Sequence, residues 1–190
     1  MPNPNKNKGK SWERDLAKHL ITVFNLNFER VPSSGAFVGG KNSFRMQKLT
    51  AAQQLISTGD IIVPDGLDQF SIEAKFYSDF SFGSLLSEQN AQLDKWIAQG
   101  NTSNKMSLIV FKINRMGGFV CFNKEIGKSL QIPGNYFMYK DNYIVSIENF
   151  FEKNKENFLS LNKNPIKLSY EGTHKLTTGV GDTTAPASIN

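Results

Sequence analysis

Cysteine and histidine are nearly absent from this sequence. Cys121 is the single cysteine, and His19 and His174 are the two histidines among 190 residues. One cysteine excludes an intramolecular disulfide, and these residues are too few to supply the four ligands of a Cys/His zinc site. Any metal ion in this protein therefore needs oxygen ligands, which are the ligands that Mg²⁺ and Mn²⁺ prefer.

Long apolar runs are absent as well. No stretch comes near the roughly 20 apolar residues that a membrane-spanning helix needs, and residues 1–10 lack the apolar segment of a signal peptide. We therefore expect a cytoplasmic protein with no membrane partner. Its length suits one compact domain with a hydrophobic core rather than two.

The composition divides the chain into three parts. Residues 1–10 are rich in Asn, Lys and Pro and predict a flexible basic arm, and residues 169–190 predict a disordered tail. Residues 11–168 predict a single domain, with a core over about 11–122 and a C-terminal extension over 123–168.

Hydrophobic periodicity and turn residues give an order of elements. The predicted elements are a helix from an N-cap at Ser11 to about 24, strands at 28–32, 60–63 and 70–76, a helix over 84–99, strands at 107–113, 119–122, 136–139 and 143–145, and a helix over 146–158. This order predicts an α/β or α+β fold, in which helices flank a central mixed β-sheet.

The basic residues are concentrated in two acid-free clusters. A net charge of +5 and a pI near 9.2 favour a polyanionic partner. The clusters are Lys6, Lys8 and Lys10 in the arm, and Lys41, Arg45 and Lys48 in an apparent insertion over 39–58. Either cluster is also compatible with ordinary solvated surface.

Two apolar strands carry three charged residues. Asp60 precedes an aliphatic run, and Glu73 and Lys75 alternate with apolar residues. Side chains repeat every two residues along a strand, so Glu73 and Lys75 project from the same face. Charges among buried residues need a partner or a metal ion to offset their desolvation. Taken alone, the pattern is a weak signal, because a Glu-x-Lys pair on a strand is more often part of a solvent-exposed face.

These residues suit phosphodiester chemistry. Asp60 and Glu73 could form a hard oxygen site for Mg²⁺, which orients a water on a phosphodiester and neutralises the leaving oxygen. Lys75 could stabilise the charge that develops on the phosphoryl group. Glu13, at the edge of the apolar face of the first helix, supplies a third acid, although it is also placed to favour the positive end of its own helix.

The order of these motifs resembles the PD-(D/E)XK nuclease superfamily, and within it the archaeal-type Holliday junction resolvases. The segments that match are Lys8–Leu16 with the first-helix acid, Arg30–Gly35 with the arginine, proline and serine turn, Asp60–Ile62 with the metal aspartate, and Ile72–Lys75 with the signature. The resemblance covers about residues 8–113 and implies a restriction-endonuclease-like core.

The resemblance also implies roles for individual residues. It implies that Glu13, Asp60 and Glu73 hold Mg²⁺ or Mn²⁺, that Lys75 and Ser34 assist catalysis, and that Arg30 contacts a phosphate. From the residues alone, Ser34 is equally well explained as a turn residue. The chain departs from the pattern at Gly59, where the superfamily usually has proline, and in the longer segment between residues 35 and 60.

We therefore expect a Mg²⁺-dependent DNA endonuclease that acts on branched DNA in recombination and repair, without a nucleotide cofactor. A homodimer is expected, because two symmetric cuts in a four-way junction need two sites. The two basic clusters and Arg30 would bind the DNA backbone. The alternatives are a restriction- or repair-type nuclease acting on duplex, flap or single-stranded DNA, and a non-catalytic nucleic-acid-binding protein with the same fold.

Overall fold

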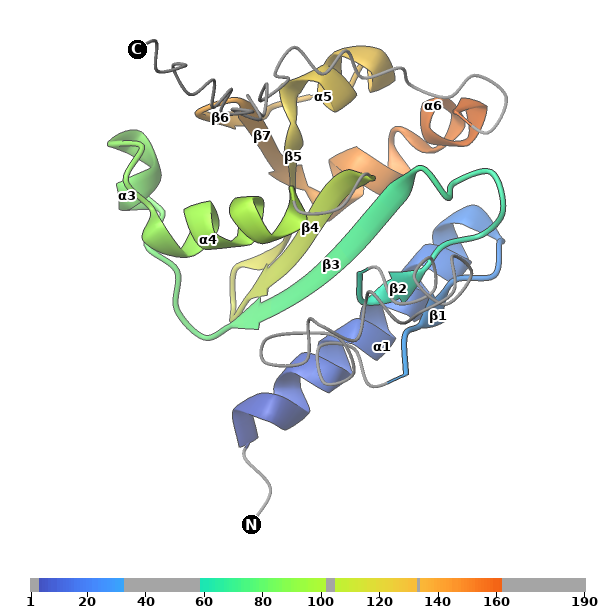
Figure 1. The fold of residues 1–190 in the computed structure, drawn as a ribbon, viewed down its shortest axis with the longest axis horizontal. Helices are drawn as coiled ribbons and strands as arrows, with labels where there is room; N and C mark the ends of the chain where they lie inside the picture. Colours follow the sequence, from blue (N-terminus) through green and yellow to red (C-terminus); the bar gives the residue numbers. More distant parts are fainter. Residues whose placement is uncertain (1–3, 33–58, 102–104, 133, 162–190) are drawn as a thin grey trace, which may run out of the picture.

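A seven-stranded sheet forms the centre of the structure (Figure 1). The computed structural model describes residues 4–32, 59–101, 105–132 and 134–161. In chain order the elements are α1 (Pro4–Phe24), β1 (Glu29–Arg30), β2 (Ile61–Ile62), β3 (Phe70–Tyr77), α3 (Gly83–Leu86), α4 (Ala91–Gly100), β4 (Met106–Ile113), β5 (Gly117–Asn123), α5 (Lys124–Leu130), β6 (Phe137–Tyr139), β7 (Asn142–Ser146), the π-helix η2 (Glu148–Glu152) and α6 (Lys155–Ser160).

The sheet is mixed, as the sequence predicted. Its strand order is β1-β2-β3-β4-β5-β7-β6. Strands β3 and β4 are parallel, and every other neighbouring pair is antiparallel. The parallel pair requires a crossover connection, which α3 and α4 supply. The expected hairpin of β2 and β3 is confirmed, with Ile61 paired to Ile72.

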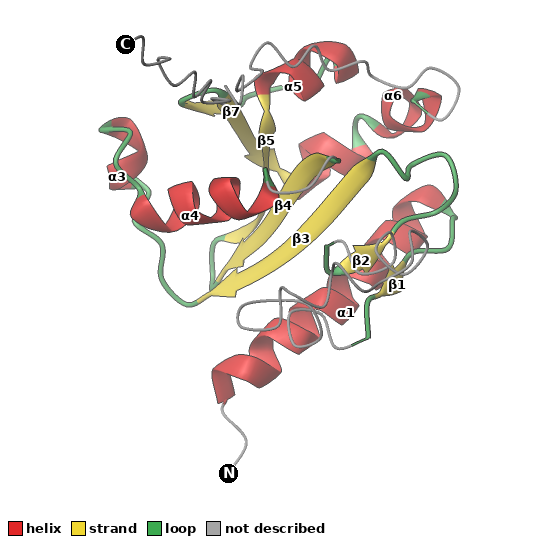
Figure 2. Ribbon diagram, in the orientation of Figure 1, coloured by secondary structure: helices red, strands yellow, loops and turns green. Residues whose placement is uncertain are grey.

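Helices cover both faces of the sheet (Figure 2). Leu108 and Val110 of β4 lie in the core that includes residues of α1 and α6. The alternate residues, Ile109 and Phe111, lie in a second core with Leu93 of α4. Strand β4 is therefore buried on both faces, which explains why its sequence is a continuous apolar run rather than an alternating one.

Helix α1 is fixed by a buried tryptophan. Leu16, Leu20 and Phe24 recur at a spacing of four residues and are buried. Trp12, one turn earlier, is also buried, and its indole Nε1 donates a hydrogen bond to the carbonyl oxygen of Val110 at 3.3 Å. This contact with β4 sets the position of the neighbouring residue, Glu13.

The helix boundaries differ from the predicted ones in three places. Helix α1 begins at Pro4 rather than at Ser11, so residues 4–10, expected to belong to a flexible arm, form its first turns. Proline is favoured at the first position of a helix, because its missing N–H has no intrahelical partner there. The predicted helix over 146–158 is divided into η2 and α6, with Asn154 buried between them.

The predicted helix over 84–99 is also divided, into α3 and α4. The side chain of Asn90 accepts a hydrogen bond from the N–H of Leu93 and so caps a new helix. The N–H of Asn90 donates to the hydroxyl of Tyr139 on β6 at 2.9 Å. A tertiary contact with a distant strand therefore fixes the break.

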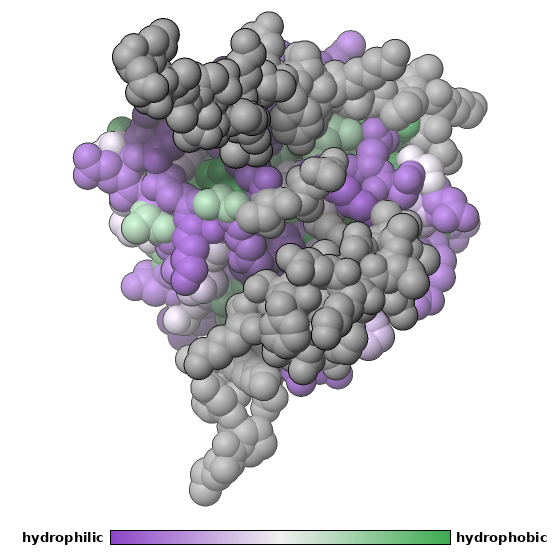
Figure 3. Space-filling model, in the orientation of Figure 1, coloured by the Kyte–Doolittle hydropathy of each residue, from purple (hydrophilic) through white to green (hydrophobic). Residues whose placement is uncertain are grey.

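The strands over 136–139 and 143–145 are confirmed as β6 and β7, and α5 was not predicted. No helix within the described residues is long and apolar enough to span a membrane. The predicted insertion over 39–58 and the predicted tail over 169–190 lie outside the described residues. On the face in Figure 3, hydrophilic residues occupy most of the described surface.

Candidate active site

The site lies at the start of β2, beside β3. The N–H of Asp60 donates to the carbonyl oxygen of Ile72 at 2.8 Å, and its own carbonyl oxygen accepts from the N–H of Val31 at 2.9 Å. Its side chain continues this pattern, because Oδ2 accepts from the N–H of Ala74 at 2.9 Å. Asp60 is therefore held by both its backbone and its carboxylate.

Gly59 allows the backbone before Asp60 to lie close to the backbone of β3. Its φ is +82°, and a Cβ atom there would lie 2.8 Å from the carbonyl oxygen of Ile72. Only glycine adopts such a φ at low cost, and proline is locked at a negative φ. The glycine in place of the superfamily proline is therefore required by the backbone of this chain.

Glu73 and Lys75 project from one face of β3, as their spacing predicted. Their neighbours Phe70 and Ile72 belong to the core beneath α1, so the two charged side chains face the side that α4 covers. Lys75 Nζ lies 2.9 Å from Glu73 Oε2. Both side chains are largely buried, with 18% and 15% of their surfaces exposed, so water screens this pair only weakly.

Glu13 reaches the site from α1 and is paired with Arg30. Nε of Arg30 lies 2.5 Å from Oε2 of Glu13. The two side chains are 24% and 13% exposed, respectively. Because α1 begins at Pro4, Glu13 lies in the middle of the helix rather than in its first turn, so the helix dipole does not explain its place there. Arg30 is its partner instead, a contact that the sequence did not predict.

The acids influence one another. The pKa of Glu73 is raised above its usual value, chiefly because burial disfavours the carboxylate. The positive charge of Lys75 opposes this shift, whereas the negative charges of Asp60 and Glu13 add to it. Glu13, Asp60, Glu73 and Lys75 therefore share one electrostatic environment.

Comparison with known protein families gives one match over most of the chain. The family described as "Phage putative PDDEXK endonuclease" matches residues 4–167. The chain belongs to this family. The resemblance to the PD-(D/E)XK nucleases that the motifs indicated is thereby confirmed.

Other comparisons of this PDDEXK family member are less informative. A structure search finds Hjc, a Holliday junction resolvase from Archaeoglobus fulgidus, at 12% identity and a TM-score of 0.33. The match covers 79% of this chain and 95% of Hjc. No curated protein matches the sequence.

The donor set of this PDDEXK family member fits a hard divalent ion. Glu13, Asp60 and Glu73 supply carboxylate oxygens. The pKa of Glu73 is raised chiefly by burial and further by the charges of Asp60 and Glu13, and a bound cation would favour its ionised form. Such an ion, when bound, orients water and neutralises charge on a phosphodiester. Within the described ranges, however, no three Asp, Glu, His or Cys side chains are gathered closely enough to hold a metal ion as they stand.

The structure brings only some of the predicted DNA-binding residues to the site. Lys8 of α1 lines a hollow of about 330 Å³ together with residues 76–78, which lie just beyond Lys75. Lys10 is exposed on the same helix. Ser34, predicted to assist catalysis, and Lys41, Arg45 and Lys48, predicted to bind DNA, lie outside the described residues.

One residue near the acids was missed. Gln99, in the last turn of α4, donates from Nε2 to Oε2 of Glu73 at 3.4 Å. Helix α4 lies close to β4 here, since a Cβ on Gly100 would lie 2.2 Å from Oγ of Ser107. Nothing in the sequence indicated that Gln99 contacts Glu73, because this contact depends on how α4 crosses the sheet.

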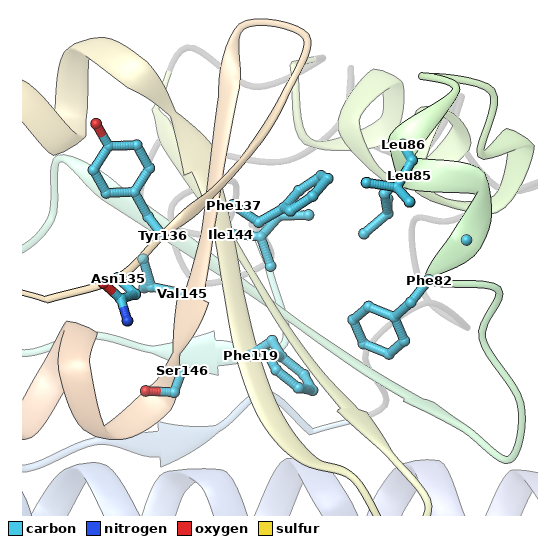
Figure 4. A pocket seen from close by; sticks show the side chains of 11 residues that line it. Phe82, Leu85, Leu86, Phe119, Asn135, Tyr136, Phe137, Ile144, Val145 and Ser146 are labelled. Carbon is cyan, nitrogen blue, oxygen red and sulfur yellow. The ribbon is translucent and has the colours of Figure 1, made fainter.

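A second, larger hollow is lined, among the described residues, by side chains that do not suit catalysis. It has a volume of about 560 Å³ and lies between α3 and strands β5, β6 and β7, where Phe82 and Leu85 face Phe137 and Ile144 (Figure 4). The described residues that line it include no charged side chain. We therefore place the candidate active site at β2 and β3, not in this hollow.

Proposed function

We propose that the protein is a DNA endonuclease that uses Mg²⁺ or Mn²⁺, held by Glu13, Asp60 and Glu73. The observation that carries the proposal is the weakly screened pair of Glu73 and Lys75 beside Asp60, within a chain of a PDDEXK family. Lys75 would stabilise the charge that develops on the scissile phosphate, and Arg30 and Lys8 would contact the backbone.

We further propose that the preferred substrate is branched DNA and that the active form is a homodimer. The support is the order of the motifs, which resembles the archaeal-type resolvases, and the need of a four-way junction for two symmetric cuts. Ser34 and the cluster of Lys41, Arg45 and Lys48 are proposed to act near the phosphates.

A cleavage assay tests the proposal. Purified protein is incubated with Mg²⁺ and with four-way junction, flap, duplex or single-stranded DNA, and the same reactions are run with Glu73→Ala. Glu125→Ala is the matched control, because Glu125 is an exposed acid paired with Lys128 on α5. We expect cleavage by the parent and by the control, and none by Glu73→Ala.

Each outcome has a distinct meaning. Full activity of Glu73→Ala would overturn the assigned site. Junction cleavage no faster than duplex cleavage would overturn the branched-DNA preference and leave the endonuclease. DNA binding without cleavage of any substrate would show a non-catalytic protein. A monomeric mass by light scattering in the presence of junction DNA would overturn the homodimer.

A further inference from the structure

The pair of Arg30 and Glu13 has an unusual position, because one partner is a proposed metal ligand and the other a proposed phosphate contact. Both side chains belong to well-fixed elements. Glu13 follows Trp12, whose indole is bonded to β4, and Arg30 is paired with Ile61 of β2. The pair is therefore a defined contact of the site, unlike a mobile surface pair.

The pair opposes metal binding. The carboxylate of Glu13 is bonded to a guanidinium, and a divalent cation at the same carboxylate would be repelled by that charge. Among the described residues, no three potential metal ligands are gathered into one group. This is expected if the carboxylates of Glu13 and Glu73 are held by Arg30 and Lys75 rather than turned toward a common point.

A phosphate can replace Glu13 as the partner of Arg30. A guanidinium binds phosphate and carboxylate with the same fork of N–H donors, so the exchange keeps its hydrogen bonds. Arg30 remains 24% exposed, so its guanidinium can be reached from solvent. The phosphate would also offset the positive charge that Arg30 places near the metal.

We infer that Arg30 couples metal binding to DNA binding: it holds Glu13 while DNA is absent, and a DNA phosphate draws it away so that Glu13 can bind the metal. This inference rests on the proposed function. The coupling is reciprocal, because DNA must tighten metal binding by the same factor by which metal tightens DNA binding.

The test measures Ca²⁺ binding by calorimetry, with and without a saturating uncut duplex, for the parent, Arg30→Gln and Arg14→Gln. Arg14 is the matched control, because it neighbours Glu13 on α1 but is exposed and donates from Nε to the carbonyl oxygen of Lys10. Arg30→Lys is a second variant, which keeps the charge without the planar fork. Circular dichroism checks the fold of each protein.

In the parent, we expect DNA to tighten Ca²⁺ binding by about 5–150-fold. Arg30→Gln should bind Ca²⁺ more tightly than the parent when DNA is absent, and should lose most of the tightening by DNA. Arg30→Lys should also lose part of that tightening, and Arg14→Gln should match the parent in both measurements.

Two results would overturn the inference. If Arg30→Gln and Arg30→Lys keep the tightening of the parent while the parent cleaves DNA in Mg²⁺, the coupling role is wrong and the proposed function stands. If the parent binds no Ca²⁺ in either condition and cleaves no DNA in Mg²⁺, the proposed function fails and the coupling fails with it.

Discussion

The carboxylate of Asp60 accepts a hydrogen bond from the backbone N–H of Ala74, with 2.9 Å between Oδ2 and N. Asp60 directly precedes β2, so its side chain extends the contact with β3 beyond the first paired residue of β2. A proposed metal ligand is thus also a structural acceptor for the sheet, and the two roles can be separated by substitution.

Asp60→Asn keeps an acceptor oxygen of the same reach and removes the charge. We expect the melting temperature to stay near that of the parent and DNA cleavage to fall by about 100-fold or more, because a bound metal contributes several kcal/mol to the transition state. Asp60→Ala should lose the same activity and also about 1–3 kcal/mol of stability, because the N–H of Ala74 loses its partner. Calorimetry and the cleavage assay distinguish these effects. Equal stability of the two variants would show that the bond is unimportant.

Gly59→Ala should destabilise the protein by about 1–3 kcal/mol, because alanine is strained at positive φ and its Cβ would contact the backbone of β3. Gly117→Ala is the control, since Gly117 has a φ of +97° and open space around its would-be Cβ. Urea unfolding of both variants measures the difference. If the loss of unfolding free energy is no larger for Gly59→Ala than for Gly117→Ala, the close approach to Ile72 does not contribute to the destabilisation.

Glu73→Gln should make the metal-free protein more stable at neutral pH. The pKa of Glu73 is raised in the folded state, chiefly by burial, so this group contributes stability that is present below the unfolded pKa and lost as pH rises through the folded pKa. Glutamine has no charge to desolvate, so it avoids the free-energy cost of burying the Glu73 carboxylate. We therefore expect the melting temperature of the variant to exceed that of the parent at pH 7.5, with a smaller difference at pH 4.5, in buffers that contain EDTA. A difference that does not change with pH would contradict the cause assigned here.

Gln99→Leu should weaken metal binding and cleavage by about 10-fold, the lower end of the effect of residues that orient metal ligands, because its bond to Glu73 is long. Gln92→Leu, two turns earlier on α4, is the control for the polar-to-apolar change. Ca²⁺ calorimetry gives a readout that does not depend on turnover. Indistinguishable affinities of the two variants would remove Gln99 from the site.

The sequence predicted those parts of the site that depend on local geometry. Glu73 and Lys75 share a face because strands repeat every two residues, and no tertiary information is needed for that. The bond between Asp60 and Ala74 and the pair of Glu13 with Arg30 depend on how separate segments come together. Periodicity along one segment contains no information about such contacts.

The same reasoning explains the divided helices. Apolar positions from Leu85 to Trp96 follow a helical spacing across the break, so the pattern predicted one helix. The break depends on Asn90, which caps α4 and bonds to a strand 49 residues away. At the start of α1, the polar composition of residues 4–10 predicted no helix. These residues nevertheless continue the helix whose apolar positions from Trp12 onward are packed in the core, and composition alone does not show such a continuation.

The hydroxyl of Tyr139 has a consequence for any attempt to shorten the protein. It accepts from the N–H of Asn90 and donates to Asp94, so a strand at the far edge of the sheet supports the first turn of α4. The last turn of the same helix carries Gln99 to Glu73. A fragment that ends at residue 122 would keep all the recognisable motif segments and lose this support. We therefore expect that the segment with the motifs cannot form the complete site without the strands that follow it.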